Sequence, residues 1–145
     1  KVLTVDTDCI FMKDFEYPET PTGYFPREAL PGTIGWEAQG TRVAAGCVYT
    51  DSRALPVAQA VASRIEEGPM RWFIDQIALA DVFSRVEDKD VTKFDGHFMD
   101  WEFVEGTVIW TGKGPRKHEN QTYLKAKKEF NRLPSAISNT WERVL

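Results

Sequence analysis

The chain has 145 residues, of which 42% are hydrophobic and 28% charged, so it can form one ordinary globular domain with a core. Its net charge of −4 combines an acidic body, with 10 Lys and Arg against 19 Asp and Glu in residues 1–112, and a basic tail, with 8 against 3 in residues 113–145. The acidic body argues against a nucleic-acid-binding protein, which usually presents a basic face. No apolar run reaches about 18 residues and no basic-then-apolar leader precedes the first strand, so we expect a cytoplasmic protein without a transmembrane segment.

The first twelve residues predict a strand that ends in two acids. Val2, Leu3 and Val5 are apolar, a pattern typical of a strand buried on both faces within a parallel sheet. Asp6 and Asp8 follow at the end of this strand, where open α/β sheets place their ligands. A carboxylate is costly to bury without a partner, and Mn²⁺ or Mg²⁺ held by one or two carboxylates is a suitable partner. An acidic turn capped by its own backbone is the alternative.

Residues 17–41 contain four of the eight prolines and four of the ten glycines. This density predicts a long loop and excludes both a helix and a central strand. Tyr24, Phe25 and Trp36 argue against disorder of the loop. These aromatic side chains either anchor the loop to the core or offer their faces to a ligand.

A second apolar strand is predicted at residues 43–49, with the small residues Ala45 and Gly46 at its centre. Small residues let the backbone approach a ligand closely, and a tightly packed strand without a ligand would favour them equally. Cys9 and Cys47 each fall in a predicted core strand, so we expect buried free thiols rather than a disulfide or a zinc site.

Two helices are predicted in the middle of the chain. The first covers residues 55–67, because residues 50–52 (Thr-Asp-Ser) offer good N-cap chemistry. The second covers residues 72–86 and is apolar nearly all round, so we expect it to be buried. Asp75 and Gln76 fall in its first turn. There an acid is stabilised by the free N–H groups and the helix dipole, or it faces a cleft.

In the last third of the chain, short strands are predicted at residues 91–94 and 106–110 and a basic helix at residues 119–132. Between the last strand and this helix, glycines are interleaved with cations. Backbone N–H groups and Lys or Arg charges together suit a diphosphate. The residues of this predicted cradle are Lys113, Gly114, Arg116 and Lys117. Its spacing is not that of a P-loop, and ordinary surface charges are the alternative.

Three motifs in chain order resemble the catalytic half of GT-A glycosyltransferases. They are Asp-x-Asp at residues 6–8, Ala-Gly within a strand at residues 45–46, and Trp-x-x-Asp-Gln-x-Ala-Leu at residues 72–79. The likeness is greatest to the retaining, galactosyltransferase-like group that includes glycogenin, and it covers residues 1–118. It implies an α/β domain with a mixed, mostly parallel sheet flanked by helices, and we expect residues 119–145 to form a helical tail packed on this domain. In this family a nucleoside-binding βαβ segment precedes the Asp-x-Asp strand, so either this chain is a fragment of a longer polypeptide or the resemblance is misleading.

The resemblance implies transfer of a sugar from a nucleotide-sugar donor to a saccharide, lipid-linked or protein acceptor, with Mn²⁺ or Mg²⁺ as the cofactor. Asp6 and Asp8 would link the protein to the metal and the diphosphate. Asp75 and Gln76 would be the catalytic residues facing the donor sugar. The remaining donor-site residues would be Ala45, Gly46, Lys113, Gly114, Arg116 and Lys117.

The family closes its donor site with a His-x-x-Gly-x-x-Lys stretch whose His is a metal ligand. Gly114 and Lys117 match this pattern, but Thr111 stands at the His position. His118, seven residues further on, is the candidate third metal ligand if the loop folds back. In the family, the region that matches residues 17–41 helps to shape the acceptor side.

Two other functions compete with this interpretation. Haloacid-dehalogenase-type phosphatases also carry Asp-x-Asp after a core strand, but Gly-Thr or Gly-Val usually follows it, whereas Cys9-Ile10 stands here. The alternative from a different class is a non-catalytic fragment or degenerate relative that serves as a binding or structural module. Thr111 at the His position favours this alternative.

Overall fold

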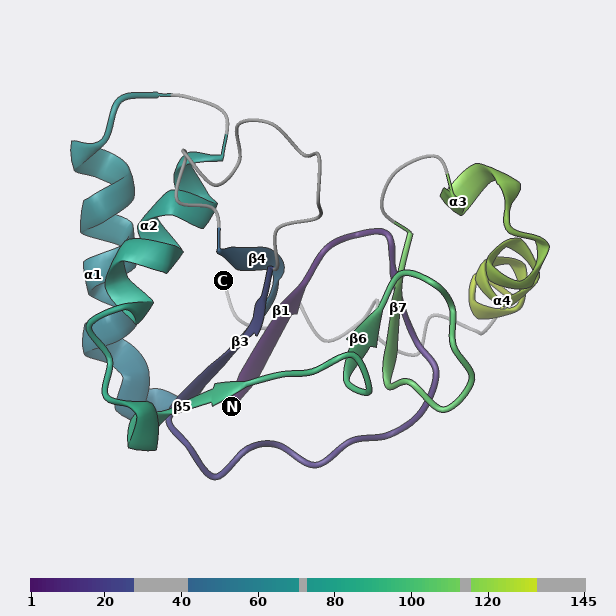
Figure 1. Cartoon of the computed structure of the whole chain (residues 1–145), viewed down its shortest axis with the longest axis horizontal. Coiled ribbons are helices and arrows are strands. Elements are labelled where there is room, and N and C mark those ends of the chain that lie inside the picture. Colours follow the sequence, from purple (N-terminus) through teal and green to yellow (C-terminus); the bar gives the residue numbers. More distant parts are fainter. Residues whose placement is uncertain (28–41, 71–72, 113–115, 133–145) are drawn as a thin grey trace, which may run out of the picture.

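The computed structural model describes residues 1–27, 42–70, 73–112 and 116–132, the first residue of the last range by its backbone only. Two helices lie side by side at one end of the molecule, two others lie at the opposite end, and the strands lie between them (Figure 1). The described residues form two sheets, one of four strands and one of three.

The four-stranded sheet has the order β1-β4-β3-β5. Its strands are β1 (Val2–Val5), β3 (Thr22–Pro26), β4 (Val43–Thr50) and β5 (Val91–Lys93). Strand β4 pairs antiparallel with both β1 and β3, and β3 pairs parallel with β5.

The three-stranded sheet has the order β2-β7-β6. Its strands are β2 (Cys9–Phe11), β6 (Met99–Asp100) and β7 (Ile109–Thr111). Strand β7 pairs antiparallel with β2 and parallel with β6. The prediction of an α/β domain is confirmed, but the prediction of a mostly parallel sheet is wrong. Three of the five strand pairings in the described residues are antiparallel.

Strand β1 is not buried on both faces as predicted. It lies at the edge of the sheet that the described residues form, and its side chains alternate between exposed and half-buried. Leu3 and Val5 pack against the core cluster of Tyr49 and Cys47, while Val2 is 60% exposed. The apolar residues therefore cover one face only, because an antiparallel edge strand has a single buried side.

Strand β3 corrects a second prediction, since residues 22–26 form an inner strand within the proline-rich stretch. Pro21 precedes the strand and Pro26 is its last residue, so Thr22–Phe25 keep the N–H groups that a ladder needs. The pairing with β4 shifts in register between Tyr24 and Phe25. Residues 28–41 of the predicted loop, with Trp36, lie outside the described residues.

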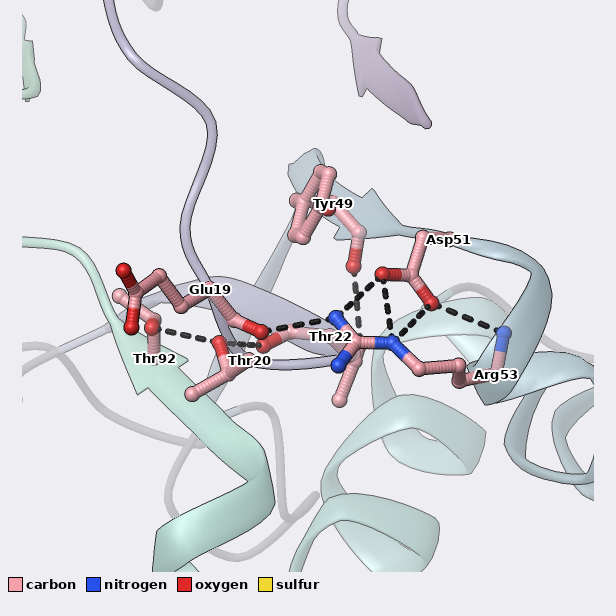
Figure 2. Close-up of polar contacts among 7 residues, drawn as sticks. All are labelled: Glu19, Thr20, Thr22, Tyr49, Asp51, Arg53 and Thr92. Atoms are coloured by element: carbon pink, nitrogen blue, oxygen red, sulfur yellow. Dashed lines mark hydrogen bonds and ion pairs between the residues drawn. The ribbon is translucent and has the colours of Figure 1, made fainter.

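Polar side chains tie the ends of β3, β4 and β5 together (Figure 2). The Thr22 hydroxyl donates to the Tyr49 carbonyl oxygen at 2.8 Å, and the Arg53 guanidinium donates to the Glu19 carbonyl oxygen at 2.7 Å. The Asp51 carboxylate accepts from the Arg53 backbone N–H at 2.8 Å, the capping role predicted for this stretch.

The helical turn capped by Asp51 runs into α1 (Leu55–Glu67), as predicted. Helix α2 (Ile74–Phe83) is shorter than predicted but buries Ile77, Ala78 and Phe83. It packs against β4 and against α1, and its Asp81 forms ion pairs with Arg64 of α1 and with Arg85, which follows α2.

At the other end of the molecule, the predicted basic helix is split into α3 (Arg116–Glu119) and α4 (Gln121–Phe130). Asn120 separates them because its side chain accepts from the Tyr123 N–H at 3.0 Å and so caps α4. Helix α4 packs on the three-stranded sheet through a cluster of Ile10, Phe103, Trp110 and Tyr123. Within the described ranges, no helix has the length and apolarity needed to cross a bilayer.

Candidate donor-binding site

The two acids of the Asp-x-Asp motif lie in the turn that joins β1 to β2, where the chain passes from one sheet to the other. The Asp6 N–H donates to the Gly46 carbonyl oxygen at 3.3 Å, and the Cys9 N–H donates to the Asp6 carbonyl oxygen at 3.1 Å. The turn is therefore held at one end by β4 and closes on itself. Both side chains are only partly buried, so a ligand can reach them.

Gly46 provides the space that the Asp6 carboxylate occupies. A Cβ built on Gly46 would lie 2.1 Å from Asp6 Oδ2 and 2.3 Å from Asp6 Cγ. No side chain can be placed there without displacing the carboxylate. The small-residue pair at 45–46 was predicted to lie close to a donor sugar. In the described structure Gly46 accommodates the carboxylate of the first acid of the motif, and Ala45 next to it is half-buried.

Asp8 is held from the opposite side by the end of β7 and by the two C-terminal helices. Its backbone carbonyl accepts from the Gly112 N–H at 2.9 Å and from the Tyr123 hydroxyl at 2.7 Å. Its carboxylate Oδ2 lies 3.4 Å from Lys117 Nζ. The other oxygen, Oδ1, is buried and has no hydrogen-bond partner in the described residues. An unsatisfied buried carboxylate oxygen needs a compensating group.

Of the predicted cradle residues, Lys117 lies beside the Asp-x-Asp motif. Lys113 and Gly114 lie outside the described residues, as does the side chain of Arg116. His118 is exposed on α3. In the part of the chain that the structure describes, no three His, Cys, Asp or Glu side chains are placed to hold an ion, so His118 is not brought together with Asp6 and Asp8.

Cys9 and Thr111 lie beside this turn, and sequence reasoning had not placed them together. They face each other as paired residues of β2 and β7, and Thr111 is fully buried. Burial raises the pKa of the Cys9 thiol above its ordinary value, and the Asp6 and Asp8 carboxylates raise it further.

The two residues predicted to be catalytic point in different directions. Asp75 is exposed in the first turn of α2, whereas Gln76 is buried, because successive helix residues are rotated by about 100°. The Gln76 side-chain oxygen accepts from Arg27 Nη1 at 2.6 Å. Arg27 also lies 5.9 Å from the centre of the Phe73 ring. Sequence reasoning missed Arg27, because strand β3, which it directly follows, was itself not predicted.

Phe73 precedes α2 with φ of 65°, in the left-handed region. This conformation is strained for a bulky residue, by about 1–3 kcal/mol, and such strain is concentrated at functional sites. It sets the direction in which α2 presents Asp75.

A cavity of about 480 Å³ opens at the carboxyl ends of the parallel strands β3 and β5. Its lining is mostly aromatic and apolar, with one cation and one acid: Phe25, Pro26, Lys93, Phe94, Asp95, Gly96 and Trp101. Phe25, one of the aromatic residues noted in the proline-rich stretch, is therefore both a core residue and part of a cavity wall.

Comparison of the chain with protein-family models, with curated proteins and with solved structures finds no match. Two carboxylates in one turn suit a hard divalent cation, which takes oxygen ligands, and one of them has a buried oxygen that no described residue satisfies. A lysine beside them suits a phosphate group bridged to that cation.

Proposed function

We propose that this chain is the catalytic half of a metal-dependent glycosyltransferase that uses a nucleotide-sugar donor. The observation that carries the proposal is the Asp8 carboxylate, which has one buried oxygen without a partner among the described residues and the other beside Lys117. A carboxylate and an ammonium group at this spacing suit the two ends of a metal–diphosphate pair. The Asp-x-Asp, Ala-Gly and Asp-Gln motifs occur in the same order as in GT-A glycosyltransferases. We therefore propose that the diphosphate belongs to a nucleotide-sugar donor.

Asp6 and Asp8 would hold Mn²⁺ or Mg²⁺, which acts as a Lewis acid and neutralises charge on the leaving diphosphate. Lys117 would donate to a diphosphate oxygen and stabilise the same charge as the sugar leaves. The exposed Asp75 carboxylate would contact donor-sugar hydroxyls or the positive charge that develops on the sugar. Gln76, which is held by Arg27, would fix the start of α2 that presents Asp75.

The cavity at the ends of β3 and β5 is our proposed place for the acceptor. Aromatic faces pack well on the apolar faces of sugar rings, and Asp95 and Lys93 supply polar partners for hydroxyl groups. We therefore favour an acceptor that presents a saccharide unit.

Metal binding by an Asp8→Ala variant tests the proposal. The matched control is Asp14→Ala, which removes the same charge from an exposed acid. Titration calorimetry with Mn²⁺ in the presence of a nucleoside diphosphate should show Mn²⁺ binding weakened at least about tenfold in Asp8→Ala and unchanged in the control.

Metal-dependent hydrolysis of a nucleotide-sugar separates this function from the two alternatives. A glycosyltransferase cleaves the nucleotide-sugar slowly, a phosphatase prefers a phosphomonoester, and a binding module does neither. Unchanged Mn²⁺ binding in Asp8→Ala would refute the proposed site.

A further inference from the structure

Helix α4, which lies outside the glycosyltransferase resemblance, reaches the Asp-x-Asp turn through one side chain. The Tyr123 hydroxyl donates to the Asp8 carbonyl oxygen at 2.7 Å, and Tyr123 is fully buried. The same carbonyl oxygen accepts from the Gly112 N–H at 2.9 Å. The Asp8 peptide is therefore held by two donors from distant parts of the chain.

The Tyr123 ring is itself held firmly. It packs against Phe103 with ring centroids 4.8 Å apart, and its N–H donates to the Asn120 side chain. Gly112 makes room for the hydroxyl, because a Cβ at Gly112 would lie 2.3 Å from it. Burial raises the pKa of Tyr123 above its ordinary value, and the nearby Asp8 raises it further.

We propose that Tyr123 is a positioning residue for Asp8, which fixes the Asp8 peptide so that the carboxylate can take a divalent cation. This inference rests on the proposed function. An Asp side chain has only two rotatable bonds, so the position of its carboxylate follows the position of its backbone. One carboxylate oxygen of Asp8 lies beside Lys117, and the other is buried without a partner in the described residues. A small shift of the Asp8 peptide would change both environments.

A purely structural role for Tyr123 makes a different prediction. A buried tyrosine needs a partner for its hydroxyl wherever it is, and the Asp8 carbonyl would then serve only that need. Loss of the hydroxyl would lower stability without changing metal binding. Trp110 provides the matched comparison, because it belongs to the same core cluster and its indole Nε1 donates to another backbone carbonyl, that of Val104, at 2.9 Å.

The experiment compares Tyr123→Phe, Trp110→Phe and the unchanged chain. Each variant keeps an aromatic ring in the cluster and loses one hydrogen bond to a carbonyl oxygen. Mn²⁺ affinity is measured by titration calorimetry, with Mn²⁺ alone and with inorganic pyrophosphate as the diphosphate probe, and melting temperature is measured alongside. We expect Tyr123→Phe to weaken Mn²⁺ binding about tenfold, as is typical when the group that orients a metal ligand is lost. We expect Trp110→Phe to bind Mn²⁺ like the unchanged chain.

Amide hydrogen exchange provides a second measurement that needs no metal. The Gly112 N–H donates to the Asp8 carbonyl oxygen, and only Tyr123→Phe removes the second donor that holds this carbonyl in place. The Gly112 N–H should therefore exchange faster in Tyr123→Phe than in Trp110→Phe. Asn120→Ala, a change at the cap of α4, is a milder variant that should loosen Tyr123 and weaken Mn²⁺ binding by a smaller factor in the same direction.

The outcomes separate this inference from the proposed function. Equal Mn²⁺ affinity in Tyr123→Phe and the unchanged chain would overturn the role of Tyr123 and leave the metal site standing. Equal losses in Tyr123→Phe and Trp110→Phe would also overturn it, since a general loosening of the cluster would then explain both. An unchanged chain that binds no Mn²⁺ with or without pyrophosphate would overturn the proposed function and this inference together.

Discussion

Gly46→Ala gives the sharpest test of the geometry at the Asp-x-Asp motif. A Cβ at this position would lie 2.1 Å from Asp6 Oδ2, whereas an ordinary contact begins at 3.4 Å, so the carboxylate oxygen has to move by about 1.3 Å. Metal–ligand distances tolerate about 0.2 Å. The substitution should therefore remove Asp6 from a metal site almost as completely as Asp6→Ala does.

The fold should tolerate this change better than the site does. Overpacking typically costs about 1–3 kcal/mol, and replacing a strand glycine by alanine recovers about 0.5–1 kcal/mol of it. Because a partly exposed carboxylate can rotate away, we expect a net loss of about 1–2 kcal/mol in the free energy of unfolding. Denaturant unfolding measures this loss, and calorimetric titration with Mn²⁺ and a nucleoside diphosphate measures the site.

Gly96→Ala is the control for the glycine substitution itself, because a Cβ there would meet no atom within 4 Å. It should leave both the unfolding free energy and the Mn²⁺ affinity nearly unchanged. If Gly46→Ala bound Mn²⁺ as tightly as the unchanged chain, Asp6 would not be a metal ligand in the position described. If it unfolded the chain outright, the Asp6–Gly46 contact would be a structural requirement, and Asp6→Asn would become the variant that tests metal binding.

Three further predictions concern single charged residues. Lys117→Ala should weaken the binding of a nucleoside diphosphate by about 1.5–3 kcal/mol, the usual worth of a charge-assisted contact. It should also strengthen the binding of Mn²⁺ alone, because the substitution removes the ammonium group that competes with Mn²⁺ for Asp8. Calorimetry with the nucleoside diphosphate and with Mn²⁺ separately measures the two opposite changes. Asp75→Asn should change the unfolding free energy by no more than about 1 kcal/mol but lower nucleotide-sugar turnover by about 10²–10³; early melting with normal turnover would make Asp75 structural. The Arg64 hydrogen bond lowers the pKa of the Asp81 carboxyl below its ordinary value of 3.8. The stabilisation by this interaction is therefore complete above pH 3.8 and is lost as the pH falls through the lowered pKa of Asp81. Asp81→Asn should be less stable than the unchanged chain at neutral pH and should approach the stability of the unchanged chain in acid. Denaturant unfolding at both pH values measures this difference.

The elements that sequence reasoning predicted well are those specified by local signals. Helix α1 covers the predicted residues 55–67, directly after the turn that Asp51 caps, and strand β4 is one residue longer than predicted. Strand β3 was missed because proline density was taken as a property of the whole stretch. Only the positions of Pro21 and Pro26 matter, and both lie at the limits of the strand. Pairing direction was also missed, because apolar composition alone does not distinguish an edge strand from an inner one when the strand has four residues.

The candidate site shows the same division between local and distant information. Asp6, Asp8 and Lys117 were predicted from short motifs, and the structure brings Lys117 to Asp8. Arg27 and Tyr123 were not predicted, because each acts on a residue far along the chain, on Gln76 and Asp8 respectively. Such contacts follow from the packing of elements and leave no periodic or spacing signal in the sequence.

Because the site depends on these distant contacts, a change in packing away from the site can move its carboxylates. The Asp-x-Asp turn takes its backbone support from β4 through Gly46 on one side and from α4 through Tyr123 on the other. The two carboxylates are therefore positioned by different sheets, and a change in the packing of either sheet moves one acid relative to the other. A metal ion bound by both would in turn hold the two sheets together, since any ligand that binds only the folded state stabilises it. Mn²⁺ should thus raise the melting temperature of the unchanged chain. This rise should vanish in both Asp8→Ala and Gly46→Ala, although Gly46 lies in strand β4 and Asp8 lies in the turn between the two sheets. A rise that persisted in either variant would mean that the cation is held by one acid alone.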